Sequence, residues 1–246
     1  MLGDVNLIVV GDSFVYGHLG SDVNKESCHR RSWVSKLGRM GNFKSTTNLG
    51  APGASNARSF RVLLDHIEKT YTPGEKYLVI FCITELLRFE LPIALSDVGP
   101  SGVTTDYSEF DSNALGVLGI GNWSSVNIFG EPSPHKEKLK EFLDFHYAMF
   151  SHAEYYEKII TQQLFMLKSL LDDLNIDCLF ASTIAAPEVV RSFKFFGKTL
   201  PLIEFENTNI GSFLKASKFQ EHPCGHYGDD ANEFLANYTY NLLKER

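Results

Sequence analysis

The sequence lacks the features that mark membrane-spanning and nucleic-acid-binding proteins. None of its apolar runs approaches the roughly 20 residues that a helix needs to cross a bilayer. Its first residues show no basic segment followed by an apolar stretch and a small-residue cleavage site. No basic stripe is present, and the formal net charge is −7. Because phosphate binding depends on clustered Lys and Arg, we expect no nucleic-acid partner, no membrane association and a cytoplasmic location.

Cysteine is scarce and scattered. The cysteines form neither a CxxC pair nor the spacing of zinc ligands, and they are Cys28, Cys82, Cys178 and Cys224. Cys82 and Cys178 fall within apolar runs, which predicts buried free thiols. The sequence therefore indicates no metal site and favours a reducing compartment.

What is present is the composition of a globular α/β domain, with 43% hydrophobic residues over 246 positions. Continuous apolar runs predict strands that are buried on both faces, at residues 5–10, 76–84 and 177–183. Helical patterns lie between and after these strands, over residues 32–40, from residue 57, over 136–175 and over 230–243. In the second of these helices, Ala57, Leu63 and Leu64 share the face expected to be buried. The alternation predicts one domain over residues 1–246, a parallel sheet covered by helices on both faces.

One stretch of the chain departs from this pattern. Residues 92–134 are rich in Gly, Pro, Ser, Asp and Asn, which predicts a long irregular insertion. Its aromatic residues Trp123 and Phe129 are candidates to line a substrate cleft.

Residues capable of chemistry follow the predicted strands where they end. Ser13 follows the first strand, Gly50 lies in a turn after a short second strand at 46–49, and Thr84 ends the central strand. His226 precedes the last helix. Because ligands bind beyond the carboxyl ends of parallel strands, we expect these residues to converge. A serine nucleophile needs a base for its proton and N–H donors for the oxyanion, and His226 and Gly50 are candidates for these roles.

Three blocks resemble the GDSL/SGNH hydrolases, in the family's order and over nearly the whole chain. Residues 11–17 (GDSFVYG) are similar to the first block and residues 48–53 (NLGAPG) to the second. The last block is similar to His226 with the small residues that follow it, Ala231, Asn232 and Ala236. The resemblance implies a three-layer α/β/α flavodoxin-like fold. It also implies metal-free and cofactor-free ester hydrolysis through an acyl-enzyme, with Ser13 as nucleophile, His226 as base and Gly50 as an oxyanion donor.

The third block departs from the family's Gly-x-Asn-Asp, because residues 82–85 read Cys-Ile-Thr-Glu. Thr84, through its hydroxyl, and Arg88, one helical turn later, are candidates for the oxyanion or substrate contacts that the family's Asn makes. A Thr-x-x-x-Arg pattern at this point resembles divergent members from tailed phages, and a phage origin would favour association with a virion.

The catalytic acid is also unassigned. The family places it three residues before the histidine, where this chain has Pro223. Glu221 and Asp229 are candidates, a Ser–His dyad is the alternative, and His222 is a rival base. Asp12 belongs to the predicted catalytic set as a hydrogen-bond acceptor that braces the turn beside Ser13.

The sequence thus leaves three functions open at one site. The first is hydrolysis of a small-molecule or glycan ester, with removal of acetyl groups from glycans as one example. The second is a binding or virion structural protein that retains the fold without catalysis. The third is acyl transfer or thioester hydrolysis. The sequence gives no indication of an oligomeric state.

Overall fold

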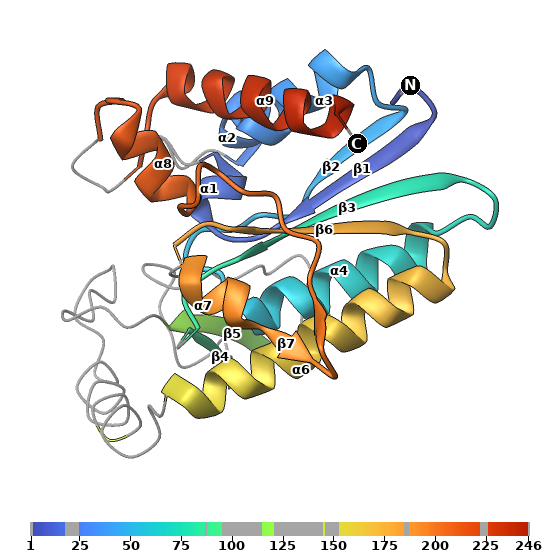
Figure 1. Cartoon of the computed structure of the whole chain (residues 1–246), viewed down its shortest axis with the longest axis vertical. Coiled ribbons are helices and arrows are strands. Elements are labelled where there is room, and N and C mark those ends of the chain that lie inside the picture. The colour runs from blue at the N-terminus through green and yellow to red at the C-terminus, as the bar shows by residue number, and fades with distance from the viewer. Residues whose placement is uncertain are drawn as a thin grey trace.

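The computed structural model of the chain describes residues 2–17, 25–86, 88–94, 115–120, 145, 153–184, 187–221 and 226–245. Its central feature is a parallel sheet with the strand order β2-β1-β3-β6 (Figure 1). The strands are β1 (Val5–Val10), β2 (Ser45–Asn48), β3 (Lys76–Ile83) and β6 (Asp177–Ser182). The chain moves from β1 outward to β2 and then returns to place β3 on the other side of β1. The sheet order therefore reverses between β1 and β3.

A short extended segment continues the sheet beyond β6. The Phe180 N–H donates to the Pro201 carbonyl at 2.9 Å, and the Ile203 N–H donates to the Phe180 carbonyl at 2.7 Å. Leu202 lies parallel to Phe180 in this bridge. The resulting order is that of flavodoxin-like sheets.

Helices cover both faces of the sheet (Figure 1). One face carries α3 (Trp33–Gly41), α8 (Ile210–Ala216) and α9 (Asp229–Lys244), together with the short α1 (Ser13–Tyr16) and α2 (Lys25–Arg31). The other face carries α4 (Asn56–Thr70), α6 (Ala153–Asp173) and α7 (Pro187–Ser192). The predicted three-layer α/β/α fold is confirmed.

Alternation along the strands divides the core into two. Leu7 and Val9 of β1 pack with the residues of α3, α8 and α9, whereas Ile8 and Val10 pack with those of α4 and α6. All four side chains are buried. A strand that is apolar on both faces is therefore required in the middle of the sheet, as the uninterrupted run of residues 5–10 predicts.

The prediction for the face of α4 is wrong in part. Ala57 and Leu64 are exposed, whereas Arg58 and Ser59 in the first turns are buried. The helix begins at its N-cap Ser55, close to the polar carboxyl edge of the sheet. The buried side chains at the start of the helix are therefore polar, and a search for apolar residues at helical spacing does not find them.

The expectation of an irregular insertion is also wrong in part. β4 (Phe89–Ala94) and β5 (Leu115–Ile120) pair antiparallel in a separate two-stranded sheet. Pro92 within β4 and the glycines of β5 weaken the strand signal, and a two-stranded sheet has only edge strands, where proline is tolerated. Residues 95–114 and 121–134, including Trp123 and Phe129, lie outside the described residues. Within the described ranges, no helix is both long and apolar enough to cross a membrane.

A tight hairpin lies between α7 and the 201–203 segment. It is formed by β7 (Lys194–Phe195) and β8 (Lys198–Thr199). Its two turn residues both have left-handed backbones, with φ of +51° at Phe196 and +76° at Gly197. Phe196 is 91% exposed, so its ring gains little from burial to offset the strained backbone.

We predict that Phe196→Asn stabilises the protein by about 0.5–1 kcal/mol, because asparagine tolerates the left-handed backbone better than a bulky aromatic residue. The control is Phe195→Asn, which should destabilise, since the Phe195 ring stacks on Phe165 with centroids 5.8 Å apart. Urea unfolding measures both changes. Destabilisation by both variants would contradict the strain at Phe196.

Candidate active site

Ser13 is the first residue of a one-turn helix that directly follows β1. Asp12 caps this helix, because its Oδ1 accepts a hydrogen bond from the Phe14 N–H at 3.0 Å. Gly11 allows the close approach to β3, since a Cβ at this position would lie 2.7 Å from the Cys82 Cβ. The turn therefore places Ser13 at the carboxyl edge of the sheet, beside the point where the strand order reverses. Its side chain is largely buried, with the residue 7% exposed.

The Asp12 carboxylate is fully buried and receives three hydrogen bonds. Besides the Phe14 N–H on Oδ1, Oδ2 accepts from the Thr84 hydroxyl at 2.7 Å and from the Thr183 hydroxyl at 2.8 Å. Thr84 follows β3 and Thr183 follows β6, so Asp12 ties together the ends of three strands. Burial of an unpaired carboxylate costs several kcal/mol, and these donors offset that cost.

Arg88 completes the charge balance of this cluster. Its Nη1 lies 3.6 Å from Asp12 Oδ2 and donates to Thr84 Oγ1 at 3.0 Å, and its Nε lies 3.5 Å from Glu85 Oε2. The side chain is buried. Arg88 is thus a cation between two carboxylates, and the single proton of the Thr84 hydroxyl points to Asp12. The Thr84 hydroxyl and the Arg88 guanidinium both have partners within the protein in this structure. Their contact with an oxyanion or substrate stays a prediction.

Asn56 fixes the end of β3 from the first turn of α4. Its Oδ1 accepts from the Thr84 N–H at 3.0 Å, and its Nδ2 donates to the Thr84 carbonyl at 3.3 Å. The Asn56 side chain is fully buried. The backbone at Thr84 is therefore held from both its donor and its acceptor side, which fixes the hydroxyl beside Asp12.

The loop after β2 packs against the back of α1. A Cβ at Gly50 would lie 2.5 Å from the Tyr16 N, so only glycine fits there. Asn48 organises the contact: its Oδ1 accepts from the Gly50 N–H at 2.9 Å, and its Nδ2 donates to the Val15 carbonyl at 2.8 Å. The Gly50 N–H is therefore bonded within the protein, and its role as an oxyanion donor stays a prediction.

His226 lies beside the helix that Ser13 begins. Its ring centroid is 5.6 Å from that of Phe14, and its Nδ1 is buried. The next residue, Tyr227, also packs on Phe14, and its hydroxyl donates to the Gly211 carbonyl at 3.1 Å. Burial, with a smaller effect from the charge of Glu221, raises the pKa of Tyr227. The structure thus places His226 against the residue that follows Ser13, as convergence at the sheet edge predicts.

The two candidate acids lie in different surroundings. Asp229 Oδ2 is 3.1 Å from Lys36 Nζ, and its side chain is 56% exposed. Glu221 is exposed and forms a backbone bridge with Tyr227. The acid partner of His226 therefore stays unassigned. His222 and Pro223 lie outside the described residues.

The small residues after His226 have a packing role that explains their spacing. Ala231 and Ala236 are fully buried on the face of α9 that shares a core with α3. Asn232 joins the two helices, because its Oδ1 accepts from the Trp33 N–H at 2.9 Å. This block therefore fixes α9, and with it the segment that carries His226, against α3.

Cys82 is the other nucleophilic side chain close to the cluster. Burial, together with the negative charge of Asp12, raises its pKa well above the usual range. The thiol is therefore held in its unreactive protonated form. Within the described ranges, no group of three His, Cys, Asp or Glu residues is arranged to hold a metal ion.

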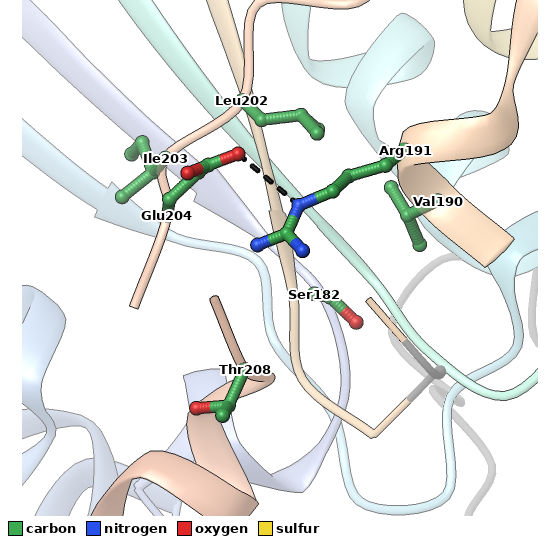
Figure 2. A pocket seen from close by; sticks show the side chains of 7 residues that line it. All are labelled: Ser182, Val190, Arg191, Leu202, Ile203, Glu204 and Thr208. Atoms are coloured by element: carbon green, nitrogen blue, oxygen red, sulfur yellow. Dashed lines mark hydrogen bonds and ion pairs between the residues drawn. The ribbon is translucent and has the colours of Figure 1, made fainter. Parts of the chain in front are cut away.

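A pocket lies at the carboxyl end of β6 (Figure 2). Arg191 is held there by Glu204, with Nε 3.2 Å from Oε1, and by Asn207, whose Oδ1 lies 2.8 Å from Nη2. Ser182, the residue before Thr183, forms part of the lining. Residue patterns reveal neither this pocket nor Thr183, because the pocket forms only where α7 and residues 202–204 lie beside the end of β6. The contact of Thr183 with Asp12 in turn requires β6 to pair with β3.

Comparisons with known proteins find similar solved structures but no match to a family model or a curated protein. A solved structure from Veillonella parvula DSM 2008, a member of the lipolytic protein G-D-S-L family, is 10% identical at a TM-score of 0.48, covering 98% of this chain and 100% of that chain. A G-D-S-L family protein from Desulfitobacterium hafniense DCB-2 is 9% identical at a TM-score of 0.40, covering 96% and 98%. Because these values are low, we base no functional assignment on them.

The contact between Gly50 and α1 can be tested by mutation. We predict that Gly50→Ala lowers the free energy of unfolding by about 1–3 kcal/mol, because the new Cβ meets backbone atoms that cannot move independently. Gly3→Ala is the control, since its nearest neighbour would be the Asn42 carbonyl oxygen at 3.4 Å. That change should stay within about 0.5 kcal/mol. Equal effects of the two substitutions in chemical denaturation would contradict the packing described.

Proposed function

We propose that the chain is a serine hydrolase that cleaves carboxylic esters, with Ser13 as nucleophile and His226 as base. The observation that carries the proposal is the position of Ser13 at the start of α1, beside the reversal of strand order where sheets of this type bind ligands. Within the described ranges, neither the Ser13 hydroxyl nor its backbone N–H makes a hydrogen bond. In the proposed reaction both groups contact the substrate.

The chemistry follows from these groups. The Ser13 Oγ attacks the ester carbonyl carbon while His226 accepts the hydroxyl proton. The Ser13 N–H lies at the N-terminus of α1 and is a donor for the oxygen that becomes negative. Collapse of the intermediate expels the alcohol, which takes the proton from His226. Water then attacks the acyl-enzyme by the same route, which releases the acid and restores Ser13.

Two finer points belong to the proposal. Esters of small molecules or glycans are the substrates, and acetyl groups on glycans are a candidate class, because the net charge of −7 disfavours strongly anionic substrates. Acyl transfer and thioester hydrolysis would use the same nucleophile. Competition by added alcohols separates acyl transfer from hydrolysis, and assay of a thioester substrate tests thioester hydrolysis.

A second candidate function is binding without catalysis. Two specific observations favour it: the Gly50 N–H already donates a hydrogen bond to Asn48, and the Thr84 hydroxyl already donates one to Asp12. An oxyanion site that lacks these donors would have to rely on the Ser13 N–H. A folded wild-type protein that hydrolyses no ester would support this second candidate.

We predict that the wild-type protein hydrolyses short-chain p-nitrophenyl esters and that Ser13→Ala lowers kcat/KM by at least about 10³-fold, because the nucleophile is lost. Release of acetate from O-acetylated oligosaccharides, measured on the same pair of proteins, tests the glycan class.

The control for this experiment is Ser169→Ala. Ser169 is exposed on α6, on the opposite side of the sheet from α1, and its removal should leave kcat/KM unchanged. Equal rates for wild type and Ser13→Ala with every ester would contradict the proposal.

A further inference from the structure

Thr183 is the one member of the Asp12 cluster to which neither the sequence blocks nor the proposed reaction gives a role. It follows β6 directly and is fully buried. Its N–H donates to the Ile83 carbonyl at 2.9 Å, which fixes its backbone against the end of β3. Its hydroxyl lies 2.8 Å from Asp12 Oδ2 and 3.1 Å from the same Ile83 carbonyl.

The direction of the hydrogen bonds in this cluster is determined by the number of protons. The Arg88 guanidinium can only donate, so the Thr84 hydroxyl accepts a hydrogen bond from it and donates one to Asp12. The Thr183 hydroxyl has two acceptors in reach, and the closer, charged carboxylate is the stronger one. Oδ2 of Asp12 is therefore held from two sides, by the threonine that follows β3 and the threonine that follows β6.

Holding Oδ2 also fixes the other oxygen of the same carboxylate. Oδ1 accepts from the Phe14 N–H, and the two residues joined by that bond flank Ser13. If Asp12 rotated about its side-chain bonds, this cap would be lost and the start of α1 would be free to shift. The hydroxyls of Thr84 and Thr183 thus act on the nucleophile through Asp12 and do not require contact with substrate.

We infer that Thr183 is a positioning residue that orients Ser13 through Asp12. The inference rests on the proposed function, since it concerns the geometry of that nucleophile. It also gives Thr84 and Arg88 a joint role: Arg88 orients the Thr84 hydroxyl, which holds the same oxygen as Thr183. In this role Thr84, Arg88 and Thr183 support Ser13 through Asp12 and need not contact the substrate.

The test compares Thr183→Val with Thr183→Ser. Valine keeps the shape and removes the hydroxyl, so kcat should fall about 10–100-fold while KM stays within about twofold, because misplacement of a nucleophile affects the chemical step. Serine keeps the hydroxyl and should restore most of the activity. If the valine variant does not fold, Thr183→Cys retains the volume with only a weak S–H donor and should lower kcat several-fold.

Thr239→Val is the matched control. Thr239 is also fully buried, and its hydroxyl has no hydrogen-bond partner among the described residues. Its loss should leave kcat unchanged. An active wild type with an unchanged kcat in Thr183→Val, or an equal loss of kcat in Thr239→Val, would overturn the positioning role and leave the proposed function standing. An inactive wild type would overturn both.

Discussion

The buried carboxylate of Asp12 is the constraint on which the rest of this site depends. A charge without access to water is tolerated only where donors surround it. Here the donors come from the turn after β1, from the residue after β3 and from the residue after β6. The three strand ends must therefore meet in one arrangement. That requirement determines where α1 begins and, with it, where Ser13 lies.

Contacts around α1 and α9 also fix the position of these strand ends. Gly11 allows the turn after β1 to lie close to β3, and Gly50 allows the loop after β2 to approach the backbone of α1. Asn48 ties the loop after β2 to the end of that helix, and Asn232 ties α9 to α3. These polar contacts hold the segments that carry Ser13 and His226 at one edge of the sheet. The two cores on either side of the sheet supply the apolar burial that stabilises it.

Much of this follows from the sequence alone. The continuous apolar runs predict β1, β3 and β6 because strands in the middle of a parallel sheet are buried on both faces, and the ends of those strands predict Ser13 and Thr84. Thr183 was missed because its partner Asp12 lies 171 positions away. The contact exists only when Ser182 pairs with Ile83. The engagement of Gly50 by Asn48 and the inward-facing Arg58 likewise depend on local geometry that residue patterns do not encode.

Covalent labelling shows directly whether Ser13 is an activated nucleophile. The wild-type protein is incubated with a fluorophosphonate, and the adduct is measured by intact mass and located by peptide mapping. We expect one equivalent of adduct on Ser13. A folded protein with no adduct, or with its adduct on another residue, would contradict this expectation.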